Sequence, residues 1–187
     1  MLIKGIETFY PKTKLQWRKW LQKNHLLKDA VWVIMYKKQS GNPTISWSDA
    51  VDEALCFGWI DSLKKKLDDE STVQFFSKRK AKSTWSKVNK QKVEKLINEG
   101  LMSEAGFESI AIAKRNGSWN ILDDVDNLVI PQDLADAFMR VPGSKDQYLA
   151  LSNSAKKLIL RSLIMTKRSG TRQKLIAGIL TQLAFKT

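Results

Sequence analysis

The stretch WIDSLKKKLDDESTVQFFSKR, residues 59–79, decides the fold class of this chain. Its two arms, residues 59–67 and 72–79, contain residues that favour β-strands. The four residues between the arms, DDES at 68–71, include Asp and Ser, which favour turns. The stretch therefore predicts a β-hairpin, and the segments on both sides of it predict the rest of the fold.

The segments before the hairpin predict one further strand and two short helices. AVWVIMYKK, residues 30–38, is rich in β-branched and aromatic residues and too short for a typical helix, which indicates a buried strand. Trp17, Trp20 and Leu21 have the spacing of one helical face. Residues 46–58 begin with a capping-box spacing and continue with a helical period.

Beyond about residue 85 the apolar residues follow a helical period. Ser103 is expected to cap a helix whose inner face carries Phe107. Residues 120–130 are acidic and are predicted to be irregular. Ser144 is expected to begin a second capping box, and residues 169–170, Ser-Gly, are expected to separate the last two helices.

Together these patterns predict an α+β fold, in which a small N-terminal sheet with helices is followed by an all-helical C-terminal half. We expect an α+β lobe over residues 1–85 and a helical lobe over residues 86–187, sharing one core. The length of 187 residues is enough for such an arrangement.

The charge balance is strongly basic. Lys and Arg number 32 against 19 Asp and Glu, a formal net charge of +13. Such a field attracts nucleic acid, anionic lipid or anionic small molecules, although it could also serve solubility alone. We therefore expect an anionic small molecule or nucleic acid as partner, while the sequence does not predict the oligomeric state.

The N-terminus shows no pattern of a signal peptide, and no window contains 18 uninterrupted apolar residues, so we expect a cytoplasmic protein without a membrane span. The single cysteine, Cys56, excludes an internal disulfide. It lies in an apolar run, which favours a buried, inert thiol.

Motifs of known catalytic chemistry are absent from the sequence. There is no HExxH, Walker or GxSxG motif, and one His and one Cys are too few for a zinc site, so we predict no metal and no cofactor. His25 is expected at a helix end, near the last carbonyl groups. Asp61 could act as an acid or base beside Trp59, or it could pair with Lys64 or Lys65. Enzymatic activity is left open, with a non-enzymatic role favoured.

A basic segment interleaved with aromatic residues is the main candidate for binding. Between residues 78 and 95 there are eight basic residues and one acid, and Phe75, Phe76 and Trp85 accompany them. Basic groups neutralise phosphates and aromatic faces can stack on flat rings. Alternatively, the aromatic residues anchor the segment to the core while the lysines face water. A second candidate is a basic ridge of Lys157, Arg161 and Arg168, spaced by four and seven residues on one expected helical face.

Three segments carry a likeness to a known family: DAVDEALCFGWIDS at 49–62, the run at 75–119 with the pattern SxWSKxNKxxVExLIxxG, and the run at 131–180. They resemble the YdeI/OmpD-associated, or bacteriocin-protection, family of bacteria, over nearly the whole chain and in the right order. The resemblance implies a stress-response role in tolerance of bacteriocins or antimicrobial peptides, and no established enzymatic activity. It also places Ser83 and Asn89 within the family's signature segments.

We therefore expect a non-enzymatic stress-protection protein of this type that binds an anionic ligand through the basic–aromatic loop. The alternatives are a nucleic-acid-binding module and a small enzyme that acts on a phosphorylated substrate. The candidate ligand-binding residues are Trp59, Asp61, Arg79, Lys82, Ser83, Trp85, Lys87 and Asn89.

Overall fold

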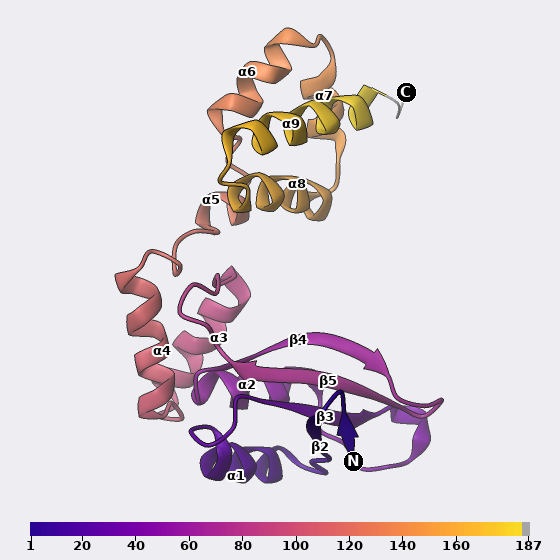
Figure 1. Cartoon of the computed structure of the whole chain (residues 1–187), viewed down its shortest axis with the longest axis vertical. Helices are drawn as coiled ribbons and strands as arrows, with labels where there is room; N and C mark the ends of the chain where they lie inside the picture. The colour runs from indigo at the N-terminus through magenta and orange to yellow at the C-terminus, as the bar shows by residue number, and fades with distance from the viewer. Residues whose placement is uncertain (185–187) are drawn as a thin grey trace. The chain divides into compact units, whose positions relative to one another are not determined.

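The computed structural model describes residues 1–184 and divides into two compact units. The first unit comprises Met1–Ser83 and Val88–Ser118, and the second comprises Thr84–Lys87 and the residues from Trp119 on. The α+β fold is confirmed, with a sheet in the N-terminal region and helices after it (Figure 1). The helices of residues 88–115 group with the sheet rather than with the helices that follow them.

Five strands form the sheet of residues 1–184, in the order β1-β2-β3-β5-β4. They are β1 (Leu2–Ile3), β2 (Ile6–Phe9), β3 (Ala30–Tyr36), β4 (Trp59–Lys66) and β5 (Ser71–Lys78). Strands β2 and β3 pair in parallel, and the other neighbours are antiparallel. The predicted hairpin is β4–β5, and its register sets Trp59 opposite Lys78. The predicted strand at 30–38 is β3.

The helices of the first unit are α1 (Lys14–Asn24), α2 (Trp47–Cys56), α3 (Lys87–Asn98) and α4 (Glu104–Arg115), with a 3₁₀ turn at Lys38–Ser40. The hydroxyl of Ser46 caps α2 as predicted, because it accepts a hydrogen bond from the Asp49 backbone N–H. Val31, Trp32 and Val33 in β3 are all buried, so both faces of this strand are covered, as predicted for a buried strand. The indole of Trp17 fills this core and donates to the Ala50 carbonyl at 3.0 Å.

Two glycines allow α4 to approach the turn between α2 and β4. A Cβ atom on Gly106 would lie 2.4 Å from the Cys56 carbonyl oxygen, and one on Gly58 would lie 2.8 Å from the Ala105 carbonyl oxygen. Gly58 also has φ +70°, in the left-handed region that favours glycine. This close approach decides which face of α4 is buried. Ile110 is buried, whereas Phe107, predicted on the inner face, is 48% exposed.

The second unit is built from five helices among the described residues: α5 (Asp123–Asp126), α6 (Gln132–Arg140), α7 (Ser144–Ala150), α8 (Asn153–Met165) and α9 (Ser169–Ala184). Their apolar faces share a core that includes Leu134, Phe138, Tyr148, Leu163 and Ile179. The rings of Phe138 and Tyr148 pack with centroids 5.3 Å apart.

Three local predictions for the second unit were wrong. The acidic segment 120–130 contains the short helix α5. Ser144 does not cap α7 from outside, because Gly143, with φ +78°, occupies the cap position. Ser144 is instead buried and donates its hydroxyl to the Val141 carbonyl at 2.7 Å. Residues 169–170 open α9 rather than separate it from α8.

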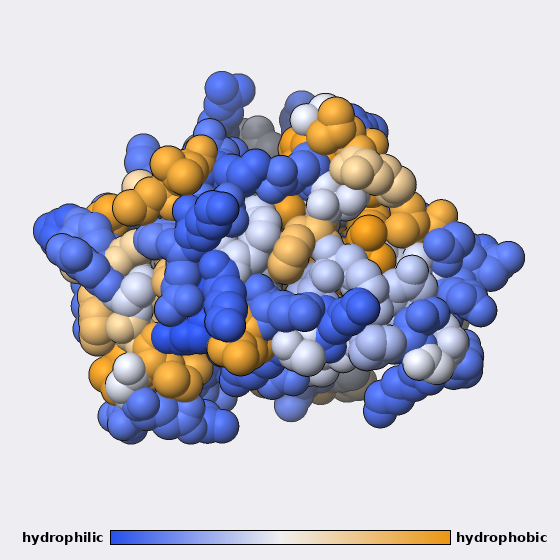
Figure 2. All heavy atoms as spheres, turned by 90° about the horizontal axis from the view of Figure 1, so that it is seen from below, coloured by the Kyte–Doolittle hydropathy of each residue, from blue (hydrophilic) through white to orange (hydrophobic). Residues whose placement is uncertain are grey.

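Figure 2 shows one face on which hydrophilic side chains predominate and hydrophobic ones form separate clusters. Scattered exposed apolar residues are normal for a folded domain. None of the helices within residues 1–184 has the length and apolarity that a membrane span requires.

Candidate functional site

A pocket of about 310 Å³ opens in the first unit, where the α2–β4 turn, the end of β5 and the helix α4 meet. We call it the loop pocket. Its basic side is formed by Lys78, Arg79 and Lys80, and its apolar side includes Phe57 and Ile112. Pockets of this size are at the lower end of those that hold small ligands.

The hairpin register brings the basic residues to this place. Because Trp59 pairs with Lys78, the chain after β5 runs beside the α2–β4 turn, and the Arg79 backbone N–H donates to the Gly58 carbonyl at 2.9 Å. The Lys78 ammonium group donates to the Leu26 carbonyl and to the Asp29 carboxylate, each at 3.0 Å, so its position is fixed from the other side. Two predicted residues, Trp59 and Arg79, therefore line one pocket.

The guanidinium of Arg79 is partly enclosed. Burial lowers the pKa of Arg79 to about 10, and the negative charge of Asp61 acts in the opposite direction. The side chain thus stays protonated at neutral pH. The Asp61 carboxylate accepts hydrogen bonds from Trp47 Nε1 at 2.9 Å and Gln74 Nε2 at 3.3 Å. These partners replace the predicted pairing of Asp61 with a nearby lysine.

Trp59 supports the pocket from beneath. Its side chain is fully buried, its indole Nε1 donates to the His25 carbonyl at 3.3 Å, and its ring meets that of Trp20 edge-on at 5.8 Å. His25 ends α1 as predicted, with its backbone N–H donating to the Leu21 carbonyl at 2.9 Å. The open side of the pocket is formed by less buried residues, including His25 and Lys80.

The other predicted residues of the first unit lie outside the loop pocket. Lys82 is exposed, and Ser83 donates its backbone N–H to the Lys80 carbonyl at 2.9 Å. The intervening Ala81 carbonyl accepts from the Asn116 side chain at 2.7 Å, which ties this loop to the end of α4. Asn89 lies in α3.

Two predicted residues, Trp85 and Lys87, belong to the second unit. Trp85 is 1% exposed, and its ring lies 4.9 Å from that of Trp119. The Lys87 backbone N–H donates to the Asp126 carboxylate at 2.9 Å. In this conformation the Trp85 indole is a packing residue, which is the alternative that the sequence left open.

The predicted basic ridge is only partly a helical face. Lys157 and Arg161 lie on α8, and Lys157 Nζ forms an ion pair with Asp126 at 2.9 Å. Arg168 lies beyond Met165, where α8 ends, so it does not continue the same face.

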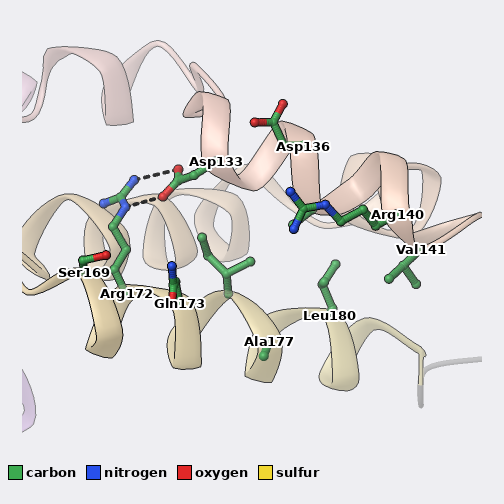
Figure 3. Close-up of a pocket in the computed structure, with 11 residues that line it drawn as sticks. Asp133, Asp136, Arg140, Val141, Ser169, Arg172, Gln173, Ala177 and Leu180 are labelled. Atoms are coloured by element: carbon green, nitrogen blue, oxygen red, sulfur yellow. Dashed lines mark hydrogen bonds and ion pairs between the residues drawn. The ribbon is translucent and has the colours of Figure 1, made fainter.

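A larger groove, of about 670 Å³, lies in the second unit between α6 and α9 (Figure 3). We call it the α6–α9 groove. At one end the Arg172 guanidinium binds both carboxylate oxygens of Asp133, at 2.5 and 3.0 Å, and also donates to the Leu163 carbonyl. The apolar lining includes Ile176 and Leu180.

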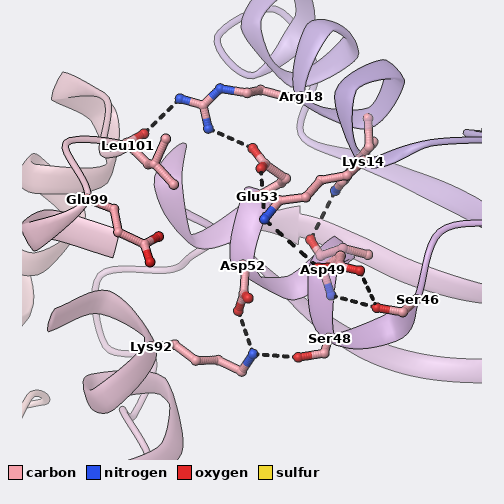
Figure 4. A network of polar contacts seen from close by, with 12 residues as sticks. Lys14, Arg18, Ser46, Ser48, Asp49, Asp52, Glu53, Lys92, Glu99 and Leu101 are labelled. Atoms are coloured by element: carbon pink, nitrogen blue, oxygen red, sulfur yellow. Dashed lines mark hydrogen bonds and ion pairs between the residues drawn. The ribbon is translucent and has the colours of Figure 1, made fainter. Parts of the chain in front are cut away.

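A polar network that the sequence analysis missed joins α1, α2 and the segment before α4 (Figure 4). Glu53 is 2% exposed, and its carboxylate lies 2.7 Å from Arg18 Nη1 and 3.6 Å from Lys14 Nζ. Arg18 also donates to the Leu101 carbonyl at 2.8 Å. The available signal was the position of Glu53, three residues after Ala50 on the inner face of α2.

No group of three His, Cys, Asp or Glu side chains that could hold a metal ion gathers within residues 1–184. The predicted burial of the thiol is confirmed: Cys56 is fully buried, and burial raises its pKa to about 11.

Two family models match the chain. Residues 9–109 match one described as a domain of unknown function, DUF8412, and residues 127–185 match one described as bacteriocin-protection, YdeI or OmpD-associated. The predicted likeness to the latter family is thus confirmed for residues 127–185, while the segment at 49–62 and most of the run at 75–119 fall in the range of the other model. Neither a curated protein nor a solved structure matches the chain.

Proposed function

The chain belongs to a family of domains of unknown function, DUF8412, and on that premise we propose that its loop pocket binds a small anionic ligand. The observation that carries this proposal is the convergence of Lys78, Arg79 and Lys80 on one pocket. Its other side is formed by apolar residues and by one acid, Glu108, which pairs with Arg115. Such a pocket suits a small molecule with a phosphate or carboxylate group beside an apolar part.

Arg79 carries the positive charge that a bound anion would stabilise most. Burial already disfavours its protonated form, because a charge removed from water loses hydration. An anion within hydrogen-bonding distance would add to the stabilisation that Asp61 gives this charge, since charge-assisted hydrogen bonds to a guanidinium are among the strongest in proteins. Lys80 is exposed at the same pocket and would attract the ligand from solution.

We expect less aromatic stacking on the ligand than the sequence alone suggested. Trp59 and Trp85 are both buried, so the contacts to the ligand come from the basic residues and the apolar wall. The negative charge of Asp61 favours the protonated form of Arg79, and Lys82 and Ser83 extend the loop next to the pocket. A nucleic-acid-binding role is the second candidate, because Lys80 and Lys82 are both exposed on this loop and could contact successive phosphates.

The physiological role that we propose is non-enzymatic protection against stress in the bacterial cytoplasm. It is supported by the match of residues 127–185 to a family described as bacteriocin-protection, YdeI or OmpD-associated. Direct capture of cationic peptides is disfavoured by the net charge of +13. Protection through an anionic ligand avoids this repulsion.

The test uses two probes on the full chain, orthophosphate and a single-stranded oligothymidylate, followed by backbone amide NMR shifts. Orthophosphate should shift the amide signals of Gly58, Arg79 and Ala81, with saturation below about 20 mM. Replacement of Lys80 by Ala should weaken this binding several-fold. The matched control is Lys19→Ala, which removes one exposed positive charge from α1 and should leave the binding unchanged.

The oligothymidylate separates the second candidate from the first. A nucleic-acid module would bind it tightly and lose affinity with a log–log salt slope of about −0.7 per phosphate neutralised. Phosphate shifts that are spread over the whole surface, or equal in the Lys80 and Lys19 variants, would refute the loop pocket as a site.

A further inference from the structure

The α6–α9 groove offers an apolar surface that no segment of the described chain covers. Its lining includes Ala137, Val141, Ile176 and Leu180, contributed by both helices and the residue after α6. From Ser169 to Leu180 the groove follows α9 over about 16 Å, because a helix rises about 1.5 Å per residue. This length suits the side of another helix rather than a compact small molecule.

The charged side chains at this groove balance one another. Asp133, Asp136, Arg140 and Arg172 line it, two acids and two bases, in a chain whose formal net charge is +13. Two copies of so basic a chain repel each other through most of their surface. A contact between copies is therefore favoured only at a region without net charge, and this groove is such a region.

Two of these charges lack an ion-pair partner within residues 1–184. Arg172 and Asp133 satisfy each other at one end of the groove. Asp136 accepts only a hydrogen bond from the Gln132 side chain at 2.7 Å, and Arg140 is exposed. Both lie on α6, one helical turn apart, on the α6 side of the groove (Figure 3). One acid and one base are thus available to a partner, one helical turn apart on α6.

We propose that a second copy of this chain docks in the α6–α9 groove across a two-fold axis, so that Arg140 of each copy faces Asp136 of the other. In a two-fold contact the same patch meets itself and must be self-complementary. An axis that runs beside α6, perpendicular to the helix and midway between the two residues, sets Arg140 of each copy opposite Asp136 of the other, which produces two opposite-charge pairs around an apolar centre. This inference is independent of the ligand proposed for the loop pocket.

The exposed side of α9 permits the approach. Ala177 lines the groove and is exposed, and a Cβ atom added to the adjacent Gly178 would find nothing within 4 Å. Small residues let two helices pack with an interaxial distance near the short end of the usual range of about 8–10 Å. Helix faces of this kind give a small interface, so we expect a dimer that dissociates on dilution.

The experiment measures molar mass by light scattering and sedimentation equilibrium, from about 1 to about 500 µM, a range that brackets the dissociation constants of small interfaces. The mass should rise from 21.4 kDa towards twice that value. Arg140→Asp and Asp136→Arg place like charges opposite each other, and each should weaken association at least about 10-fold. The matched control is Lys174→Asp, on α9 but outside the groove lining, which should dimerise as the wild type does.

A mixture of the two single variants provides the decisive measurement. Each variant alone should stay mainly monomeric, but an equimolar mixture should associate, because an acid then faces a base at both contacts between the two copies. The variant with both substitutions should associate for the same reason. A chain that stays monomeric up to the highest concentration overturns the proposal. A dimer that survives both single substitutions, or a mixture that stays monomeric, overturns it as well.

Discussion

Replacing Glu53 by Gln removes the negative charge at the centre of the polar network of the first unit (Figure 4). The Glu53 side chain is 3% exposed and lies 2.7 Å from the Arg18 guanidinium. The substitution therefore leaves Arg18, 23% exposed, beside an amide instead of a carboxylate. Because Arg18 also binds the Leu101 carbonyl just before α4, the loss is expected to loosen the helix that lines the loop pocket.

The magnitude follows from how much of the pair is shielded from water. Removing one partner of a fully buried ion pair costs about 3–5 kcal/mol. Arg18 is partly accessible to water and keeps two contacts, the Leu101 carbonyl at 2.8 Å and the Phe57 ring at 5.4 Å. We therefore expect a loss of about 2–3 kcal/mol, which is a decrease of about 30- to 150-fold in the folding equilibrium constant.

Native-state hydrogen exchange of the α2 amides measures this loss in the first unit without assuming that the whole chain unfolds together. The control is Glu94→Gln, which makes the same change at an exposed position of α3 and should alter protection by less than about 0.5 kcal/mol. The double variant Glu53→Gln/Arg18→Met should lose about 1–3 kcal/mol less stability than the sum of the losses of the two single variants. Equal protection in the Glu53 and Glu94 variants, or strict additivity with Arg18→Met, would show that the pair does not stabilise the unit.

Three further outcomes are expected. Gly106→Ala should lower the free energy of unfolding by about 1–3 kcal/mol in urea titrations, because its Cβ would meet a backbone carbonyl at 2.4 Å. Gly178→Ala is the control and should not lower it, because there is open space around Gly178. Equal urea midpoints for the two variants would contradict the close approach of α4. The Cys56 thiol, whose burial raises its pKa to about 11, should react with a disulfide reagent at about pH 8 only at the rate of unfolding, and rapid labelling of the folded chain would contradict its enclosure. Hydrogen bonding from Arg172 lowers the pKa of Asp133 in the folded state, so this pair stabilises the chain above the unfolded value of 3.8 and the contribution is lost as pH falls through the lower, folded value. The urea midpoint of the wild type should therefore fall more than that of Asp133→Asn between about pH 5 and about pH 2.5, and parallel curves would argue against it.

Much of the local structure follows from the sequence because its causes are local. The hairpin at 59–79, the strand that became β3 and the helix that carries Trp17 are each specified by a period and by turn or cap residues a few positions away. Within the loop pocket, the nearness of Trp59 and Arg79 is also a consequence of the hairpin, since its register sets the two arms side by side.

The burial of a side chain depends on what its helix or strand packs against, and the sequence did not predict this packing. Trp85 and Phe107 have similar apolar character, yet one is enclosed beside Trp119 and the other is 48% exposed. The buried pair of Glu53 with Arg18 joins residues 35 positions apart, which no local period reveals. The groove between α6 and α9 also lies between residues far apart in the sequence, so no local period reveals it.

The sequence alone determined the class of fold, the positions of most strands and helices, and the basic character of the loop after β5, because hydrophobic period and charge are properties of neighbouring residues. Only the tertiary structure decided which aromatic residues are sealed, which carboxylates are paired and where pockets open. Those properties come from the packing of helix against helix and helix against sheet, in which a glycine such as Gly106 can change the buried face of an entire helix.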